Sequence, residues 1–414
     1  MKIAYKIILP IVLIVVLGFS KYPIDGYERT GISRLLPIAK MLADSIDYNR
    51  IPVGAYKRVS EIKLNLLGRK NDSLSTLLQE DEELSEKMRR LFPGSGYSAT
   101  VMDISNPDSL RYMGYRENVG YQPGSVGKLA VLVALFDQLA KLCPEDFEQR
   151  MVILRNRKVA SDIWGTGDHH TVPVYDAKKE DVTRRRVVAK DTFSLFEWAD
   201  HMVSVSNNGA ASVVYREALL MAGLGEDYLT LTEDGANKFF EETPRDSLTD
   251  LANEIVNEPL RVLGITEDEW RLGGFFTRGP GKYVGRKGGS IGTPVGLMKF
   301  LVQLEQGNVI DEASSLEMKR LMYLTDRRIR YAHSSRLDSA AVYFKSGSFY
   351  KCDRNKNPNC GDYAGNVFNY MNSVIIVEHP DDAKYIVCLM TNVLNKNSAG
   401  AHMYLASAID EIMH

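Results

Sequence analysis

The chain is poor in the residue types that mark specialised structural classes. Four cysteines in 414 residues are too few for a disulfide scaffold, and 32 Gly with 15 Pro lie far below the share found in collagen or low-complexity chains. An excess of one charge is also missing, because 51 Lys and Arg stand against 53 Asp and Glu. This balance gives no electrostatic reason to expect a nucleic-acid partner. With 44% apolar and 25% charged residues, the composition is that of an ordinary globular protein with a sizeable core.

The N-terminus has the layout of an export signal. Lys2 and Lys6 precede an apolar run over residues 7–19, which closes on small residues. The run is short for a bilayer span of about 20 residues, so residues 1–22 are interpreted as a signal peptide or a retained signal anchor. We therefore expect an exported protein, periplasmic or anchored facing the periplasm or the cell exterior, with no other membrane contact.

Two of the four cysteines are candidates for a disulfide bond. Cys352 and Cys360 lie close together in a polar, turn-rich stretch, and export makes a bridge between them chemically feasible. A zinc site would need two further ligands, whereas Cys143 follows a helix and Cys388 lies in an apolar, strand-like run. These last two are expected to be buried thiols.

Hydrophobic periodicity predicts strands at both ends of a long helical block. Residues 30–92 have helix-like spacing. Further helices are expected over 126–142, 194–205, 210–221, 250–263, 293–306, 314–324 and 401–413. Strands are expected over 97–104, 110–115, 341–349, 373–378 and 384–391. The two strand groups bury their apolar faces most economically in one antiparallel sheet, with the helical block as a second lobe.

The first chemical motif, Ser125 and Lys128, opens the buried helix. At a spacing of three residues the two side chains share one helical face, so the Lys128 amine can reach the Ser125 hydroxyl. A lysine withdrawn from water can act as the base that a serine nucleophile requires, and the helix N-terminus offers N–H groups to an oxyanion. An N-capping serine followed by a surface lysine fits the same pattern.

Two further polar motifs follow. Ser206-Asn207-Asn208 occupies a turn between helices, where the side chains either relay protons and hold a substrate amide or cap the next helix. Lys345-Ser346-Gly347 lies on the first strand of the last group, where the Lys and Ser suit a carboxylate and the Gly allows a substrate to approach the strand edge.

In this order and in these settings, the three motifs resemble those of the penicillin-recognising serine enzymes, the class A β-lactamases and penicillin-binding DD-peptidases, which carry Ser-x-x-Lys, Ser-Asp-Asn and Lys-Thr-Gly. The resemblance implies a mixed α/β (α+β) fold of the β-lactamase/transpeptidase type. Such a fold has a five-stranded antiparallel sheet with flanking helices and an all-helical lobe, here at about 129–335. The serine hydrolase domain then covers residues 95–414, after a helical N-terminal extension over 23–94.

The resemblance also implies roles in the chemical steps. Ser125 is expected to be the acylated nucleophile, with Lys128 as its base or base partner. Ser206 relays a proton to the leaving nitrogen. The backbone N–H groups of Ser125 and Ser348 form the oxyanion hole.

Substrate binding is implied in the same way. Asn208 contacts a substrate amide, while Lys345 and Ser346, followed by Gly347, anchor a carboxylate. Asn207 stands where the family has Asp, which changes the charge expected at this turn.

Release of the acyl group is the step in which the chain departs most from the family. Class A β-lactamases carry Glu-x-x-Leu-Asn on the omega loop, and that Glu activates the water that frees the serine. The best match begins at Glu269, keeps the Leu and has Gly273 for the Asn, and it precedes a family-like Thr293-Pro294 helix start. Glu269 is therefore the candidate deacylating base, with a surface carboxylate in an acidic run as the alternative.

The remaining polar clusters are interpreted without a ligand. Asp168-His169-His170 has side chains that bind metals, but no further ligands follow at recognisable spacing, so no metal is expected. Residues 184–186, three arginines, are interpreted as a solvated charge cluster and His201 as structural. No cofactor is expected, and the chain is expected to be a monomer.

Three functions fit these observations. The leading hypothesis is a serine hydrolase of the class A β-lactamase type, which opens a β-lactam ring or a related amide through an acyl-enzyme on Ser125. Without deacylation by Glu269, slow release makes the chain a penicillin-binding, D-alanyl-D-alanine peptidase-like protein that acts on peptidoglycan-type peptides. The third is a catalytically silent envelope module that uses residues 30–92 as an interaction arm. Convergence of the motif side chains on one pocket separates the first two from the third.

Overall fold

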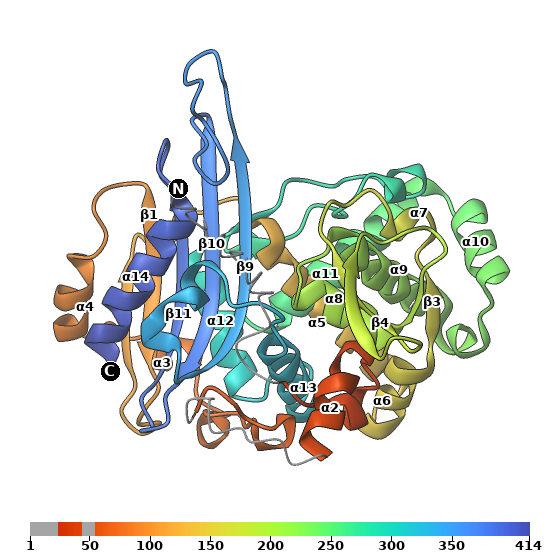
Figure 1. Ribbon diagram of the computed structural model, residues 1–414, viewed down its shortest axis with the longest axis horizontal. Helices are drawn as coiled ribbons and strands as arrows, with labels where there is room; N and C mark the ends of the chain where they lie inside the picture. Colours follow the sequence, from red (N-terminus) through yellow and green to blue (C-terminus); the bar gives the residue numbers. More distant parts are fainter. Residues whose placement is uncertain (1–23, 44–53) are drawn as a thin grey trace, which may run out of the picture.

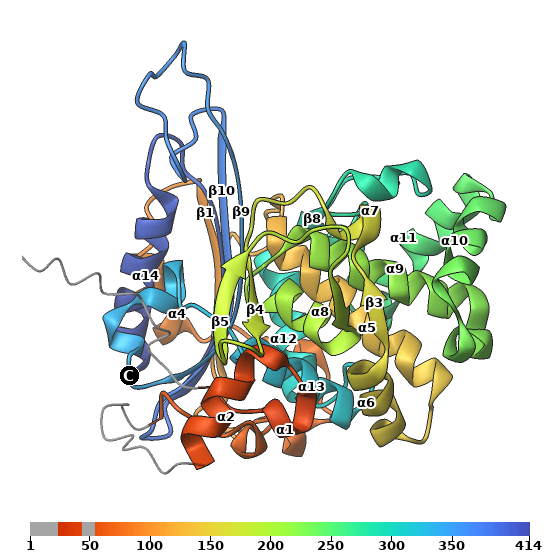
Figure 2. The same ribbon diagram turned by 45° about the vertical axis from the view of Figure 1, so that its right-hand side comes forward.

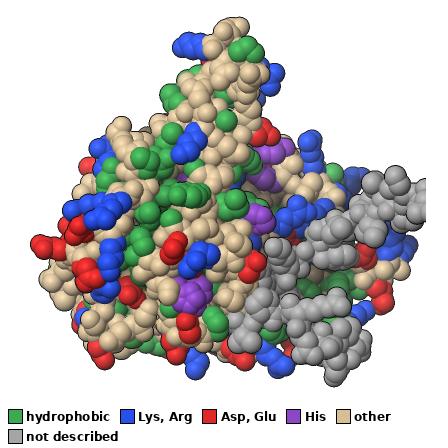
Figure 3. All heavy atoms as spheres, turned by 60° about the vertical axis from the view of Figure 1, so that its left-hand side comes forward, with side chains coloured by type: hydrophobic (Ala, Val, Ile, Leu, Met, Phe, Trp, Pro, Cys, Tyr) green, Lys and Arg blue, Asp and Glu red, His purple; other side chains and the backbone are tan. Residues whose placement is uncertain are grey.

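The computed structural model describes residues 24–43 and 54–414. The export signal predicted at residues 1–22 lies outside this part of the chain. None of the helices in these two ranges combines the length and the apolar character that a membrane span requires. On the face presented in Figure 3, basic and acidic side chains are interspersed, as the balanced composition leads one to expect.

Strands from both ends of the chain form one five-stranded antiparallel sheet in the order β2-β1-β11-β10-β9 (Figure 1). The strands are β1 (Tyr97–Asp103), β2 (Arg111–Tyr115), β9 (Ala341–Lys351), β10 (Phe368–Glu378) and β11 (Lys384–Asn392). The pairing of β1 with β11 joins the two strand groups, from Tyr97 opposite Thr391 to Asp103 opposite Tyr385. The prediction of a single antiparallel sheet is confirmed, and β9, which carries the Lys345 motif, is one of its two edge strands.

A lobe of helices lies beside the β9 edge of the sheet (Figure 1). Its helices are α5 (Lys128–Leu142), α6 (Phe147–Asn156), α7 (Asp162–Gly165), α8 (Leu195–Val203), α9 (Asn208–Leu224), α10 (Glu233–Glu242) and α11 (Arg245–Val262). Two further helices, α12 (Pro294–Glu305) and α13 (Glu312–Tyr323), lie against the sheet. All side chains from Lys128 to Phe136 on α5 are buried, which explains why this sequence is apolar on nearly every face. The Ser125 motif therefore opens the central helix of the lobe.

The last helix, α14 (Ser398–Met413), covers the sheet face opposite the helical lobe (Figure 1). Successive residues of β11 alternate between two cores, as a pleated strand requires. Cys388 belongs to the core on the lobe side, whereas Val387 and Leu389 pack with Leu405 and Ile409 of α14. The sheet is thus covered on both faces.

Three small two-stranded sheets interrupt the helical block, and the sequence did not predict them. They pair β3 (Lys158–Ala160) with β6 (Thr192–Ser194), β4 (Val172–Asp176) with β5 (Asp181–Arg185), and β7 (Trp270–Arg271) with β8 (Ile291–Gly292). Strands of two to five residues are too short to establish a period in the sequence. Asp168 lies in the segment between β3 and β4, which belong to the first two pairs.

The described part of the N-terminal extension is less helical than expected. It contains α1 (Tyr27–Thr30), α2 (Leu36–Ala43), α3 (Leu74–Leu77) and α4 (Glu82–Arg89), together with several 3-10 turns, and Figure 2 shows α1 and α2 at the base of the molecule. Partners in the main body fix this segment. Arg34 donates two hydrogen bonds to the carboxylate of Asp200 on α8, at 2.6 and 2.7 Å, and Lys57 pairs with Glu378 at the end of β10. The described part of the extension is thus held on both lobes and is not a free interaction arm.

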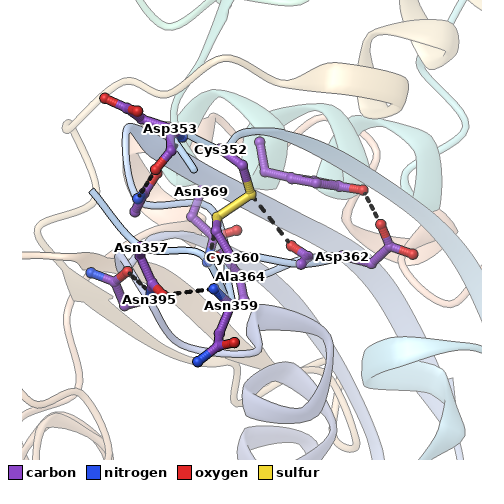
Figure 4. The surroundings of a disulfide bond; sticks show 12 residues. Cys352, Asp353, Asn357, Asn359, Cys360, Asp362, Ala364, Asn369 and Asn395 are labelled. Carbon is purple, nitrogen blue, oxygen red and sulfur yellow. Dashed lines mark hydrogen bonds between the residues drawn. A yellow bond between two sulfur atoms is a disulfide. The ribbon is translucent and has the colours of Figure 1, made fainter. Parts of the chain in front are cut away.

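The strands β9 and β10 extend past their neighbours as a projecting hairpin (Figure 1). A disulfide bond between Cys352 and Cys360 closes part of its loop, which confirms the expected pairing (Figure 4). Hydrogen bonds from the loop, such as Asn357 to Asn395 at 3.1 Å, tie it to the segment after β11. Cys143 and Cys388 are buried free thiols, as expected.

The Arg34–Asp200 pair yields a test of how the N-terminal extension is attached to the helical lobe. Asp200→Ala leaves a buried guanidinium without its carboxylate, and we expect this variant to lose about 3–5 kcal/mol of unfolding free energy. Glu180→Gln, which disrupts the exposed pair of Glu180 with Lys40, is the control and should leave the midpoint of urea denaturation unchanged. Equal midpoints for both variants and the parent would show that the extension does not hold the lobes together.

Candidate active site

The serine of the first motif lies in a tight turn that leads into the central helix. Ser125 belongs to a 3-10 turn over Gly124–Gly127, and Lys128 is the first residue of α5. The Lys128 Nζ and Ser125 Oγ atoms are 3.0 Å apart. Lys128 is fully buried, while Ser125 is only half-buried and stays accessible to a ligand. The interpretation as a surface lysine is therefore wrong.

The second motif faces the same amine. Ser206 has a left-handed backbone conformation with φ of 59°, which turns both its carbonyl and its hydroxyl toward Lys128 Nζ. Asn208 Oδ1 accepts a third hydrogen bond from Lys128 at 2.8 Å. Asn207 points away and caps α9 through the N–H of Ala210 at 2.7 Å. Asn207 thus provides the helix cap considered from the sequence, while Ser206 and Asn208 face the Lys128 amine.

The third motif closes the cluster from the edge of the sheet. Lys345 is buried on β9 and donates to Ser206 Oγ at 2.8 Å, so this hydroxyl lies between two lysine amines. We call the Gly124–Gly127 turn the nucleophile turn, after the role that the resemblance implies for Ser125. Side chains from this turn, the α8–α9 turn and β9 meet at one point, although they come from distant parts of the sequence. Ser125, Lys128, Ser206 and Lys345 therefore converge as the resemblance implies.

Gly347 brings the backbone of β9 against the nucleophile turn. A Cβ atom at Gly347 would lie 2.3 Å from the carbonyl oxygen of Pro123 and 2.7 Å from the amide nitrogen of Ser125. From the other side, a Cβ atom at Gly124 would lie 3.2 Å from the amide nitrogen of Ser348. The sequence suggested that this glycine leaves room for a substrate, whereas in the structure it leaves room for the backbone around Ser125.

Burial controls the charge of both lysines. Withdrawal from water lowers the pKa of Lys128 to about 7, and the Asp168 carboxylate acts in the opposite direction. Burial also lowers the pKa of Lys345 well below its usual value, with further lowering by the charges of Lys128 and Arg330. Near neutral pH, a substantial fraction of Lys128 is uncharged and able to accept a proton.

Two polar residues at the site were missed from the sequence. Arg330 donates to Ser346 Oγ at 2.8 Å and to Ser348 Oγ at 3.0 Å, and its guanidinium lies 5.0 Å from the ring centre of Tyr363 in the hairpin loop. Asn372 on β10 donates to the carbonyl of Gln122 at 2.9 Å and so holds the start of the nucleophile turn. Neither belongs to a short motif, and only the fold brings them to the site.

Asp168, which the sequence considered only as a potential metal ligand, also lies at the site. Its carboxylate accepts hydrogen bonds from the Asn208 backbone N–H at 2.6 Å and from Asn208 Nδ2 at 3.0 Å. The sequence drew attention to Asp168, His169 and His170 as potential metal ligands. One ligand atom from each lies within 4.8 Å of the others, but both Asp168 oxygens are already engaged with Asn208. His201 is buried with its ring against Phe193, which agrees with a structural role.

The structure does not bring Glu269 to the cluster. Its carboxylate forms an ion pair with Lys299 on α12 at 2.6 Å and accepts the backbone N–H of Thr266 at 2.8 Å. The group that faces Lys128 from this part of the chain is the ring of Phe276, with its centre 5.2 Å from Nζ. The expectation that Glu269 is the deacylating base is therefore wrong for this arrangement. The short motif matched in sequence, but the side chain points to a different partner.

Comparisons with known proteins agree with the fold. The model of a family described as the β-lactamase enzyme family matches residues 83–409. Solved structures that resemble the chain include a β-lactamase from Chitinophaga pinensis DSM 2588, at 15% identity and a TM-score of 0.50, covering 80% of this chain and 98% of that one. The TLA-1 extended-spectrum β-lactamase has 12% identity and a TM-score of 0.51, covering 81% and 98%. The TLA-3 extended-spectrum β-lactamase has 12% identity and a TM-score of 0.51, covering 80% of this chain and 98% of that one.

No curated protein matches the chain in a sequence search. At identities of 12–15% the structural likeness shows the fold alone. The family model, however, spans most of the sequence. The chain belongs to the β-lactamase enzyme family, within the superfamily of penicillin-recognising serine enzymes.

The contact at Gly347 yields a test of the site's packing. Gly347→Ala forces a methyl group into the backbone around Ser125, and we expect a loss of about 1–3 kcal/mol of unfolding free energy from overpacking. Gly281→Ala is the control, because a Cβ atom there meets nothing within 4 Å. Urea denaturation of both variants is the measurement. A Gly347 variant as stable as the control would contradict the close approach of β9 to the nucleophile turn.

Proposed function

We propose that the protein forms an acyl-enzyme through Ser125 with a β-lactam or a related cyclic or peptidic amide. The observation that carries this proposal is the set of hydrogen bonds around the Lys128 amine, which link Ser125, Ser206 and Asn208 to one buried nitrogen. A catalytically silent module has no need for this convergence. The described part of the N-terminal extension is also bonded to both lobes, so there is no reason to regard this segment as an interaction arm.

The partners of Lys128 are compatible with a neutral amine that acts as the base. An uncharged amine has two N–H donors and one lone pair. The backbone carbonyl of Ser206 and the amide oxygen of Asn208 can only accept, so each takes one N–H. The lone pair is then left for the hydroxyl hydrogen of Ser125, 3.0 Å away between heavy atoms.

In the acylation step, Lys128 takes the proton of Ser125 as the serine oxygen bonds to the carbonyl carbon of the substrate. The oxyanion is stabilised by the N–H groups of Ser125 and Ser348. The C–N bond then breaks, and the leaving nitrogen receives a proton from Ser206, whose hydroxyl lies between the two lysine amines. Lys128 returns its proton to Ser206, so the proton count balances.

Substrate binding follows from the remaining groups of the site. Lys345, Ser346 and Arg330 form a basic and hydroxylic surface that suits a substrate carboxylate. Asn208 has one amide hydrogen left after its bond to Asp168 and can donate it to a substrate carbonyl. These requirements are met by β-lactams and by the carboxyl-terminal end of a peptidoglycan-type peptide.

Deacylation is proposed to be slow. In the described part of the chain, no carboxylate forms a hydrogen bond with Ser125 or Lys128, and the apolar side chains of Leu272 and Phe276 lie next to Gly127. A water molecule beside the ester then has no acidic residue to activate it. This arrangement favours a penicillin-binding, peptidase-like protein with a persistent acyl-enzyme over a rapid β-lactamase.

Other expectations remain proposals. We infer export through residues 1–22, which places the site in the periplasm or outside the cell, where β-lactams and peptidoglycan peptides occur. We also retain a monomer with one catalytic domain over residues 95–414 after the N-terminal extension.

The acyl-enzyme is tested with a fluorescent penicillin. The protein should become covalently labelled, Ser125→Ala should abolish the label, and intact mass spectrometry should show an adduct that persists for many minutes. The Ser60→Ala variant, at an exposed position of the N-terminal extension, is the control and should label like the parent. Rapid loss of the adduct would instead support a β-lactamase, and no adduct on the parent would refute the proposed function.

The base is tested by the pH dependence of acylation at saturating β-lactam, where binding through Lys345 does not limit the rate. Because the pKa of Lys128 is lowered to about 7, the neutral base is depleted below that pH and predominates above it. The acylation rate constant, measured by stopped flow with a chromogenic cephalosporin, should fall roughly tenfold per pH unit below about pH 7 and level off above it. A rate constant that does not change with pH across this range would contradict Lys128 as the base.

A further inference from the structure

Asp168 is buried beside the site without a role in the steps described above. It follows α7 in the segment between the β3 and β4 strands, and its side chain is 2% exposed. Both carboxylate oxygens bond to Asn208, one to the backbone N–H at 2.6 Å and the other to Nδ2 at 3.0 Å. Hydrogen bonds between a carboxylate and amide donors are stronger than those between neutral groups, so Asn208 is held firmly.

These bonds decide which end of the Asn208 amide faces Lys128. With Nδ2 on Asp168, Oδ1 points to Lys128 Nζ at 2.8 Å. The reversed amide would place Oδ1 against a carboxylate oxygen and Nδ2 against the amine, with repulsion at the first contact. It would also compete for the lysine lone pair, which the hydroxyl of Ser125 requires. The orientation of Asn208 therefore affects the ability of Lys128 to act as a base.

Asp168 also supplies a negative charge that the Ser206-Asn207-Asn208 turn lacks. Asn207 stands where the family has Asp, and its side chain is used to cap α9. The charged or titratable groups nearest Lys128 are Asp168 on one side and Lys345 on the other, with His170 behind Asp168 and Arg330 beyond Lys345. Among these groups only Asp168 is an acid, so it is the one that stabilises the protonated form of Lys128.

His170 lies against this carboxylate on the side away from Lys128. Its Nδ1 atom lies 2.9 and 3.0 Å from the two oxygens of Asp168. Burial alone would raise the pKa of Asp168, but the hydrogen bond and the charge of His170, the Asn208 N–H and the Lys128 charge lower it to about 2. Asp168 is thus negatively charged throughout the range in which Lys128 titrates.

We propose that Asp168 is a positioning residue for the acylation of Ser125, because it fixes the Asn208 amide that directs the Lys128 lone pair to the serine and provides the acidic charge of the site. The proposal rests on the function proposed above. It assigns Asp168 an action through Asn208 and Lys128, without contact with the reacting atoms.

The test compares Asp168→Asn with a matched control, Asp162→Asn, which removes the same charge from an exposed position six residues earlier in the chain. In the Asp168→Asn variant, an NH2 group replaces one of the two carboxylate oxygens and must face either the backbone N–H or the NH2 group of Asn208, so one of the two bonds that hold Asn208 is lost and its orientation is less firmly fixed. We expect the limiting acylation rate constant with a chromogenic cephalosporin to fall roughly 10- to 100-fold. The control should retain the parental rate constant.

The pH profile separates positioning from a purely structural role. Without the Asp168 charge, protonated Lys128 is less stable and its pKa falls, so the acidic limb of the acylation profile should move to lower pH even though the plateau is lower. In an Asn208→Ala background, Asp168→Asn should reduce the limiting rate constant little further, because the residue acts through Asn208. If the Asp168→Asn variant does not fold, Asp168→Glu keeps the charge and displaces the carboxylate, so its plateau should fall while its limb stays in place.

The outcomes are distinct. A parental protein that is not acylated refutes the proposed function and this inference together. A parent that is acylated, with an Asp168→Asn variant that matches it in both plateau and limb, overturns the inference and leaves the proposed function intact. A lower plateau with an unmoved limb in the Asp168→Asn variant also overturns it, because the charge would then not act on Lys128. For the Asp168→Glu variant, a plateau equal to that of the parent would also overturn the inference.

Discussion

The hydrogen bonds of the buried Lys128 amine are the interaction on which the site depends. The nitrogen is withdrawn from water at the start of the central helix, and its partners come from the nucleophile turn and from the turn between α8 and α9. A lysine on the surface would be protonated at neutral pH and could not act as the base that the proposed mechanism requires. The proposed base therefore depends on the apolar character of α5, which looks like a feature of the core alone.

The fold supplies the other requirement, which is a fixed distance between the two lobes. The sheet contains strands from both ends of the domain, and its edge strand brings Lys345 to Ser206 while Gly347 admits the backbone of the nucleophile turn. The N-terminal extension bonds to α8 through Arg34 and to β10 through Lys57. Both the sheet and the extension therefore hold together the elements that meet at the site.

Much of the site could be predicted from the sequence because its principal residues lie at the starts of helices or on a strand, where short motifs have a defined geometry. Ser125, Lys128 and Lys345 are of this kind. Asp168 and Arg330 are not, since each reaches the site from a loop whose path depends on the whole fold. Glu269 shows the converse, because its local motif matched while Lys299 and Thr266, which hold its carboxylate elsewhere, are invisible to a motif.

The most direct test of the central claim is the titration of Lys128 itself, followed by NMR of the protein with 13C-labelled lysine side chains and assigned with the Lys128→Arg variant. We expect one lysine that titrates with a pKa of about 7, because burial outweighs the attraction of Asp168, and the loss of that signal in the variant. A Lys128 that titrates near 10.5, the ordinary value for lysine, would show that the amine is charged at neutral pH and would contradict its role as the base for Ser125.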